Sequence, residues 1–422
     1  MVPLTYVILA IITITFWAKL SKTLFHSYVT PWSVFGYIWI AVLCLYHLRL
    51  FNIDYPVLSW STNFMLWGGL INVFFAGLLV WILRGHKYIK KKINLSISEK
   101  YLYYAILLSS VLGLIGIGIN LYTAYKYFGL EMLKAKPWIT KAAFRTGELE
   151  VGRIWNYLIA FMIISANLIG IYLAEFKKSR ALFIIAFVAV AVHIIVSWGR
   201  IFVALFVIIL VSTFYLWKWI KGEAIQITLK TLIKGLTVFL TILIVSHIIL
   251  YIRSAFFQQF EYASEWEHYY IYLTGSIAAF DQYVSPEVSP LYLGKQTFHA
   301  IAHWLKRLKV FERNPQFMSF DNVWIPVRIN TFTAYRHFYE DFSFLGVFVP
   351  ALIIFSSMML MTSNKKRDKL LSIAFIPYIY YWATFTFIAN LYFSETAVFG
   401  ASLINIVILF LFWKKRWLKI EF

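Results

Sequence analysis

The sequence predicts an all-α, polytopic integral membrane protein with about eleven transmembrane helices. Hydrophobic residues make up 61% of the 422 residues and charged residues only 14%, whereas soluble domains are about 45–50% apolar and about 25% charged. The apolar residues come in blocks of about 17–25, the length that crosses about 30 Å of hydrocarbon as a helix. Because lipid offers no partners for backbone N–H and C=O groups, such blocks must be helical. The alternation typical of a membrane-spanning β-barrel is absent.

The length of each apolar block places the predicted spans. They lie near residues 3–18, 32–48, 64–83, 101–124, 153–174, 181–198, 201–217, 235–252, 343–361, 370–388 and 397–413. The first block lacks a basic leading segment and a small-residue cleavage site, so we interpret it as a retained helix and not a signal peptide. We treat residues 1–422 as a single membrane domain.

Basic residues set the orientation. The stretch from Arg84 to Lys100 contains six Lys and Arg residues (Arg84, Lys87, Lys90, Lys91, Lys92 and Lys100) and marks the cytoplasmic side. The N-terminus is then outside and the C-terminus is cytoplasmic. The segments that this orientation places inside hold more than half of the Lys and Arg but only about a quarter of the acids. The formal net charge of +20 is therefore explained by membrane topology and not by nucleic-acid binding.

Two outside loops are too long to be simple connectors. The first covers residues 125–152, and the second, residues 253–342, is the longest non-spanning stretch. Long loops inside a compact architecture are usually functional. In the second loop Phe298, Ile301, Leu305 and Leu308 recur at helical spacing, which predicts an amphipathic helix on the outer membrane face.

Several chemistries are excluded by missing motifs. There is no GxxxxGK[ST], HExxH or CxxC, and the one cysteine, Cys44, sits in an apolar block as a buried spectator. We therefore expect no cofactor and no metal. His193 and His247 are the main ionisable groups deep within predicted spans, and a satisfied interior histidine explains each better than a proton relay. This thin polar lining argues against an ion-coupled transporter.

Candidate functional residues gather on the predicted outside. Arg200 follows the tight turn Ser197-Trp198-Gly199, where a guanidinium beside free helix N–H groups would form an anion site; a snorkelling interfacial arginine is the alternative. Further outward arginines border the two long loops. They are Arg145, Arg153, Arg253, Arg328 and Arg336. Guanidinium groups bind phosphate oxygens in a bidentate manner, so the group suggests an anionic substrate at the outer leaflet.

The densest polar stretch runs from Asn330 to Phe342. If it is helical, Arg336 pairs with Glu340 and His337 with Asp341, each at i,i+4. A carboxylate–histidine pair could act as general base on a sugar hydroxyl; the alternative is an interfacial helix with local ion pairs. Asp281 is a second acidic candidate, with an ordinary structural role as its alternative.

At these residues the sequence resembles the oligosaccharide repeat-unit polymerases, the Wzy-type O-antigen and capsule polymerases. The small-residue-plus-Arg turn at 197–200 is one shared feature. A second is a Tyr-Leu-x-Gly-x-x-x-x-Phe stretch, here Tyr272-Leu273-Thr274-Gly275-Ser276-Ile277-Ala278-Ala279-Phe280. A third is the pattern at 330–346, in which Phe332 replaces the usual Tyr and Ser343 the first Gly.

The resemblance implies a glycosyltransferase-C-like scaffold in a bacterial cytoplasmic (inner) membrane, with its active site facing the periplasm or exterior. It implies metal-independent transfer of the growing glycan from undecaprenyl diphosphate to an incoming lipid-linked unit, in O-antigen, capsule or exopolysaccharide synthesis. Implied partners are the lipid-linked oligosaccharide, membrane lipids, a chain-length co-polymerase and a flippase. An O-antigen-ligase-type glycosyltransferase and a flippase or exporter of the same lipid-linked substrates are the alternatives.

The resulting site hypothesis assigns three roles. For the acceptor hydroxyl, the candidate general bases are His337, Asp341 and Glu340. For the diphosphate, the candidate ligands are Arg145, Arg200, Arg253 and Arg336. For the sugars, the candidate contacts are Tyr272, Asp281, Asn330, Tyr335 and Tyr339.

Overall fold

The structure is a computed structural model of the 422-residue chain. It describes residues 2–85, 93–135, 153–176, 188, 201–223, 244, 265–284, 291–309, 323–325, 328–329 and 331–421. The described residues are helical apart from loops and two small antiparallel pairs of strands. The predicted α-helical membrane class is confirmed. The chain forms two compact units, which are described separately below.

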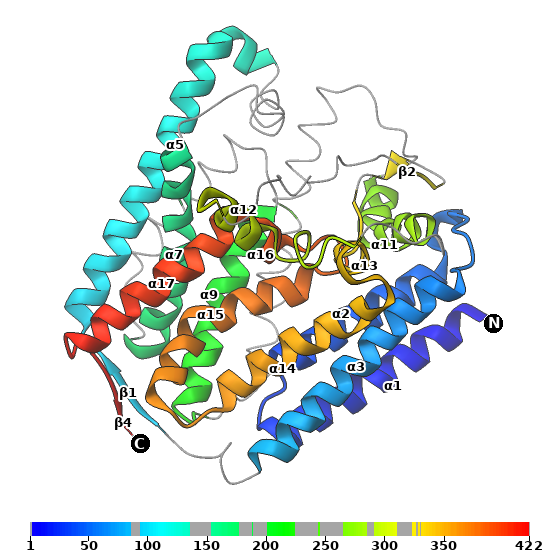
Figure 1. The fold of residues 1–422 in the computed structure, drawn as a ribbon, viewed down its shortest axis with the longest axis horizontal. Helices are drawn as coiled ribbons and strands as arrows, with labels where there is room; N and C mark the ends of the chain where they lie inside the picture. The colour runs from blue at the N-terminus through cyan, green and yellow to red at the C-terminus, as the bar shows by residue number, and fades with distance from the viewer. Residues whose placement is uncertain are drawn as a thin grey trace. The chain divides into compact units, whose positions relative to one another are not determined.

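The first unit comprises residues 1–91, 261–372 and 378–399. Its long helices are α1 (Val2–Phe25), α2 (Pro31–Leu48), α3 (Trp60–Arg84) and α14 (Val349–Thr362), and α2 packs against each of the other three (Figure 1). The unit also holds shorter elements: η1 (Leu50–Asn52), α11 (Glu265–Tyr283), α12 (His299–Arg307), α13 (Tyr335–Phe342), η2 (Ser343–Phe348), α16 (Leu391–Ser394), and the pair β2 (Val323–Trp324) and β3 (Arg328–Ile329). In the pair, Val323 lies opposite Ile329.

Local sequence signals begin and end these helices. Thr30 caps α2 through a capping box with Ser33, and Pro31 occupies the first helical position, where its missing N–H costs nothing. Ser59 caps α3 by accepting a hydrogen bond from the Thr62 N–H at 3.2 Å. The helix α3 then ends at Gly85, whose φ of +69° favours glycine.

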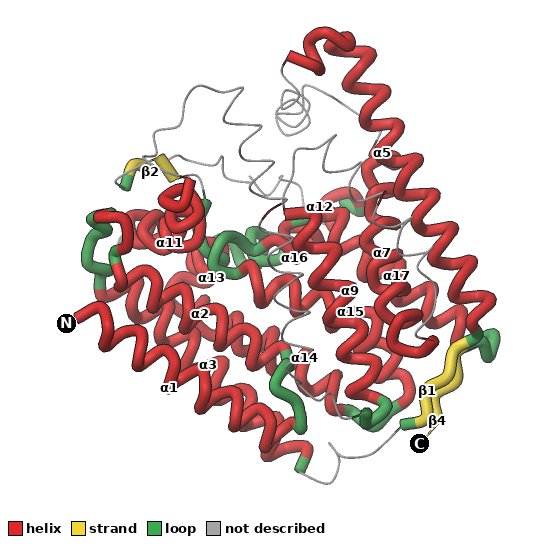
Figure 2. The backbone as a smooth tube through the Cα atoms, turned by 180° about the vertical axis from the view of Figure 1, so that it is seen from behind, coloured by secondary structure: helices red, strands yellow, loops and turns green. Residues whose placement is uncertain are grey.

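The second unit comprises residues 92–260, 373–377 and 400–422. Its described helices are α5 (Glu99–Ala135), α7 (Arg153–Phe176), α9 (Ile201–Ile220) and most of α17 (Thr396–Lys414), and α7 packs against both α5 and α9. The strands β1 (Asn94–Ile97) and β4 (Leu418–Glu421) pair antiparallel, with Asn94 opposite Glu421 (Figure 2). This pair ties the residues before α5 to the residues after α17.

A proline breaks the backbone ladder of α15 (Lys366–Phe385) within the second unit. Pro377 has no N–H, so the carbonyl of Ile373 loses its helical donor. The Asn167 side chain on α7 supplies one instead, with its Nδ2 3.0 Å from the Ile373 oxygen, and Asn405 Nδ2 on α17 lies 3.2 Å from the Ala374 oxygen. Both asparagines are fully buried, so the Asn167 amide replaces a donor that lipid cannot provide, and the Asn405 amide adds a second bond in the same turn.

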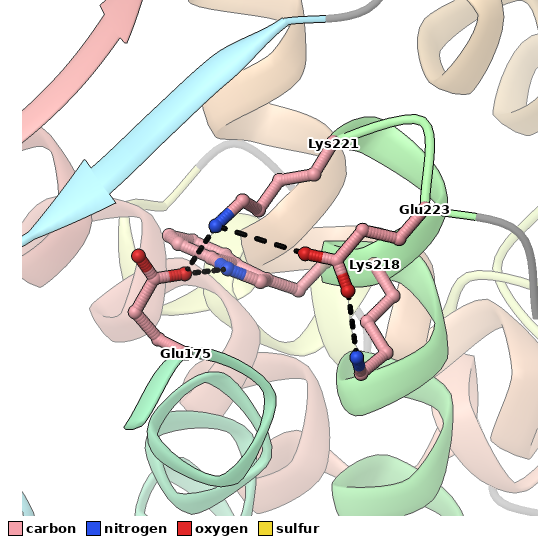
Figure 3. A network of polar contacts seen from close by, with 5 residues as sticks. Glu175, Lys218, Lys221 and Glu223 are labelled. Atoms are coloured by element: carbon pink, nitrogen blue, oxygen red, sulfur yellow. Dashed lines mark hydrogen bonds and ion pairs between the residues drawn. The ribbon is translucent and has the colours of Figure 1, made fainter. Parts of the chain in front are cut away.

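An ionic cluster joins the ends of α7 and α9. The Glu175 carboxylate accepts hydrogen bonds from Trp217 Nε1 at 2.8 Å and from Lys221 Nζ at 2.9 Å. Glu223 in turn pairs with Lys218 at 2.7 Å, and Figure 3 shows these side chains converging beyond the last turn of α9. The two lysines and two glutamates have no net positive charge that would attract an anionic ligand. We therefore interpret the cluster as one that holds the ends of α7 and α9 together.

Eight described helical segments are long and apolar enough to cross a membrane. They are Leu4–Phe25, Pro31–Leu48, Trp60–Arg84, Glu99–Met132, Tyr157–Phe176, Ile201–Ile220, Tyr335–Thr362 and Thr396–Lys414. Each overlaps one predicted span. The predicted spans at 181–198 and 235–252 lie outside the described residues, apart from the single positions 188 and 244.

The predicted span at 370–388 is a helix, α15, but it is not among the eight. Its first turn carries Lys366, Arg367, Asp368 and Lys369, and tyrosines replace aliphatic residues in its second half. These polar groups lower its mean hydropathy. The predicted loop at 125–152 is partly helical, because α5 continues to Ala135 through a break at Gly129. Its remainder, 136–152, lies outside the described residues.

The predicted loop at 253–342 holds α11, α12, α13 and the β2–β3 pair. The expected amphipathic helix is present as α12, which runs from His299 to Arg307. Ala300 and Ala302 are buried in it, whereas Leu308, just past its end, is exposed. A helix is therefore present at this position, and its amphipathic role on a membrane surface remains a prediction.

Candidate functional site

The polar stretch that the sequence singled out folds as α13, and its two ends are fixed by long-range contacts. Its N-terminus is anchored by the Ala334 N–H, which donates to the Thr386 carbonyl at 2.7 Å. After its C-terminus, η2 turns back so closely that a Cβ at Gly346 would lie 2.4 Å from the Phe338 carbonyl oxygen. Only glycine fits this approach without moving the backbone, which explains the glycine in the 330–346 pattern.

Arg336 and Glu340 form the expected i,i+4 pair. Arg336 Nε donates to Glu340 Oε1 at 2.8 Å, and the two side chains are only 6% and 1% exposed. The guanidinium carbon also lies 4.3 Å from the Tyr283 ring centroid and 4.2 Å from that of Phe332. Such cation–π contacts are strongest where the cation is desolvated. Arg336 is therefore engaged by local partners in this conformation.

Tyr283, at the end of α11, completes this cluster. Its burial, reinforced by the Glu340 carboxylate, raises the pKa of the Tyr283 phenol, while Arg336 opposes the rise. The phenol is therefore a proton donor at neutral pH, which suits a neighbour of a buried carboxylate. The Arg336–Glu340 ion pair is net neutral, so it offers little attraction to a diphosphate.

Asp341 holds the loop that precedes α12. One carboxylate oxygen accepts from the Gln296 N–H at 3.1 Å and the other from the Thr297 N–H. The same loop donates its Tyr292 and Leu293 N–H groups to the last carbonyls of α13 at 3.1 and 3.3 Å, and these carbonyls have no partner within the helix. Asp341 is fully buried. Its carboxylate oxygens each accept a backbone hydrogen bond, so it orders the loop more readily than it accepts a substrate proton.

Three histidines lie near one another on α12 and α13. His299 and His303 are one turn apart, with ring centroids separated by 6.2 Å. Burial, followed by the influence of His303 and His337, lowers the pKa of His299 to about 4. His337 is partly buried, and its carbonyl accepts from the Thr297 hydroxyl at 3.3 Å. His337, Glu340 and Asp341 remain the predicted candidates for the general base.

The tyrosines predicted to contact sugars differ in exposure. Tyr335 and Tyr339 are 1% and 2% exposed, and the Tyr335 hydroxyl packs so close to Gly69 on α3 that a Cβ there would meet it at 2.0 Å. In this conformation both rings contribute packing. Tyr272, on α11, is partly exposed.

Asp281 has a structural partner. Its Oδ1 accepts from the Ser59 N–H at 2.8 Å and from the Ser59 hydroxyl at 2.7 Å. Because Ser59 is the cap of α3, Asp281 joins α11 to the start of that helix. The ordinary structural alternative for Asp281 accounts for these contacts.

Four predicted residues lie outside the part of the chain that the structure describes. They are Arg145, Arg200, Arg253 and Asn330. Their roles remain predictions. Within the described residues no group of three or more His, Cys, Asp or Glu could hold a metal ion.

Sequence reasoning missed Tyr283, His299 and Asn390. Asn390 Nδ2 donates to the Thr297 carbonyl at 2.6 Å across 93 positions of the chain. No local spacing could have indicated that contact. His299 had a signal, because it stands one turn before His303 on a predicted amphipathic helix.

The chain was compared with known proteins at three levels. No family model, no curated protein and no solved structure matches it. The class therefore rests on the chain's own features. It is a multi-pass α-helical membrane protein with eight candidate spans among its described residues and three buried charged side chains on α13, Arg336, Glu340 and Asp341.

Proposed function

We propose that this protein polymerises undecaprenyl-diphosphate-linked oligosaccharide repeat units on the extracytoplasmic face of a bacterial cytoplasmic membrane. The observation that carries the proposal is that the two stretches behind the family resemblance pack together. The ring of Phe280, the last residue of the first stretch, packs against that of Tyr335 of the second in a tilted arrangement, with 6.3 Å between ring centroids. The next turn of α11 brings Tyr283 to Arg336. The two stretches are about 50 residues apart in the sequence and are in contact within one unit. A binding site requires residues that are brought together in this way.

The arrangement of ionisable groups also supports an enzyme. Arg336, His337, Glu340 and Asp341 all lie on α13, and α12 adds His299 and His303. A transporter would instead need ionisable groups along a path reachable from both faces. A glycosyltransferase needs them at one place, beside the membrane surface where a lipid-linked substrate presents its diphosphate.

The proposed reaction is a single displacement. An acceptor sugar hydroxyl attacks the anomeric carbon of the growing chain, the bond from that carbon to the diphosphate oxygen breaks, and undecaprenyl diphosphate leaves with the electron pair. His337 takes the hydroxyl proton. Arg145, Arg200 and Arg253 stabilise the charge that develops on the leaving diphosphate. The anomeric diphosphate supplies the energy, so no nucleotide or metal ion is required.

The test uses cells that lack the wild-type chain and are complemented with single variants. Arg200→Ala should abolish polymer and leave single lipid-linked units, because the leaving group loses a cation. Arg367→Ala removes an equal charge from an exposed position at the predicted cytoplasmic end of α15 and should give normal polymer. Normal chain lengths from Arg200→Ala at wild-type protein levels would refute the assignment.

A further inference from the structure

The loop from Tyr292 to Phe298 is held from two sides. Asp341 on α13 accepts the Gln296 and Thr297 N–H groups, as described above. From the other side, Asn390 Nδ2 donates to the Thr297 carbonyl at 2.6 Å. The backbone N–H and C=O of Thr297 are thus both hydrogen-bonded to side chains from distant parts of the chain. The helix α12 begins two residues later, at His299.

The Asn390 amide has one orientation. Its Oδ1 accepts from Trp382 Nε1 at 2.9 Å, and an indole nitrogen can only donate. The Nδ2 group must then face the Thr297 carbonyl. Asn390 is fully buried, so loss of this donor would leave the carbonyl without a substitute from water. The asparagine is therefore a rigid support for the start of α12.

We propose that Asn390 is a positioning residue: together with Asp341 it fixes the start of α12 so that His299 and His303 stand beside His337. This inference rests on the proposed function, in which His337 accepts the proton of the acceptor hydroxyl. Neither Asn390 nor the α12 histidines touch the reacting atoms in this scheme. They set the place and the proton affinity of the imidazole that does, and catalytic groups tolerate little displacement.

The groups around His299 make the placement measurable. The titratable groups that act on His299 are His303 on α12 and His337 on α13, and the packed helix α16 carries the phenol of Tyr392. If the hydrogen bonds of Asp341 and Asn390 to Thr297, which together form a clamp, hold α12 in place, His299 stays partly buried beside two imidazoles. Release of the clamp would expose it and separate it from His337, so the pKa of His299 would return toward its ordinary value of 6.5.

The experiment compares Asn390→Leu with Trp382→Phe in the full chain reconstituted in lipid nanodiscs. The leucine is close to asparagine in size and removes both the donor to Thr297 and the acceptor for Trp382, whereas Trp382→Phe removes the bond to Oδ1 and part of a buried ring but keeps the bond to Thr297. Histidines labelled with carbon-13 are titrated by NMR, and His299→Gln assigns the signal. Asn390→Leu should raise the pKa of His299 from about 4 toward 6.5, and Trp382→Phe should leave it near the wild-type value.

The kinetic arm uses an undecaprenyl-diphosphate-linked repeat unit as the only substrate. Asn390→Leu should lower kcat by about a hundredfold, the usual cost of a small misplacement, with little change in KM. An unchanged His299 titration and unchanged kcat in Asn390→Leu would overturn the inference while leaving the proposed function intact. If the wild-type protein in nanodiscs makes no polymer, the proposed function fails, and the titration alone decides whether Asn390 places the histidines.

A second variant covers the case in which Asn390→Leu does not fold. His337→Gln keeps both sides of the clamp and removes one imidazole that acts on His299. The His299 pKa should rise in this variant. An identical titration in His337→Gln and wild type would show that α12 does not face His337, and would overturn the inference by itself.

Discussion

Replacement of Arg336 by methionine should strongly destabilise the first unit. The change removes the cation and leaves the Glu340 carboxylate unpaired with its side chain only 1% exposed. Removing one partner of a buried ion pair costs about 3–5 kcal/mol, because the other charge stays buried without compensation. With total stabilities of about 5–15 kcal/mol for native proteins, that loss is about a fifth or more of the whole. The free energy of unfolding is measured by steric trapping in bicelles.

Two further variants separate the ion pair from general damage. The double variant Arg336→Met with Glu340→Leu removes both charges, and it should cost much less than the sum of the single changes. Arg49→Met breaks the exposed pair with Asp54, whose side chains are 46% and 90% exposed, and should cost less than about 1 kcal/mol. A loss of less than about 1 kcal/mol in Arg336→Met, comparable to the Arg49 control, would refute the reasoning about a desolvated pair.

Three other outcomes follow from the same structure. Gly346→Ala should cost about 1–3 kcal/mol, because the added Cβ clashes with the backbone. Gly118→Ala, whose Cβ meets nothing within 4 Å, should be neutral or slightly stabilising. A thermal unfolding measurement in which Gly346→Ala is the more stable of the two would contradict the close approach at Gly346. Asn167→Leu should cost about 1–3 kcal/mol, and less in a Pro377→Ala background, because alanine restores the missing N–H. The folded-state pKa of His299 is about 4, below its ordinary 6.5, so the unfolded chain binds the proton at a higher pH than the folded chain. The free energy of unfolding should therefore fall as pH drops from about 6.5 to about 4. His299→Gln should weaken this pH dependence of the free energy of unfolding.

The elements that sequence predicted well are those set by local rules. Block length and apolar content located the spans that the structure describes, since lipid forces each such block into a helix. Spacing at i,i+4 anticipated the Arg336–Glu340 bond, because one helical turn brings those side chains together. The same rule suggested a His337–Asp341 pair. Asp341 also accepts N–H groups from residues about 45 positions earlier, a contact set by tertiary packing, and it interacts electrostatically with His337.

The features that sequence could not predict depend on distant parts of the chain. Asn390 and Thr297 are 93 positions apart, and neither lies in a recognisable pattern. Asn167 serves a carbonyl of α15 only because Pro377 leaves that carbonyl without its donor. The burial of Tyr335 could not be predicted either, because the Tyr335 side chain packs against Gly69, a residue without a side chain on another helix. Without knowledge of that packing, a tyrosine in a polar stretch is interpreted as a sugar contact.

The central claim is tested most directly by reconstitution of the purified protein with lipid-linked repeat units as the only substrate. The account predicts a ladder of lipid-linked oligomers that grows without nucleotide, persists in EDTA and releases one undecaprenyl diphosphate for each bond formed. No product until a different acceptor is added would identify a ligase. Movement of intact units across the vesicle membrane without any new glycosidic bond would identify a flippase, and either result would contradict the account.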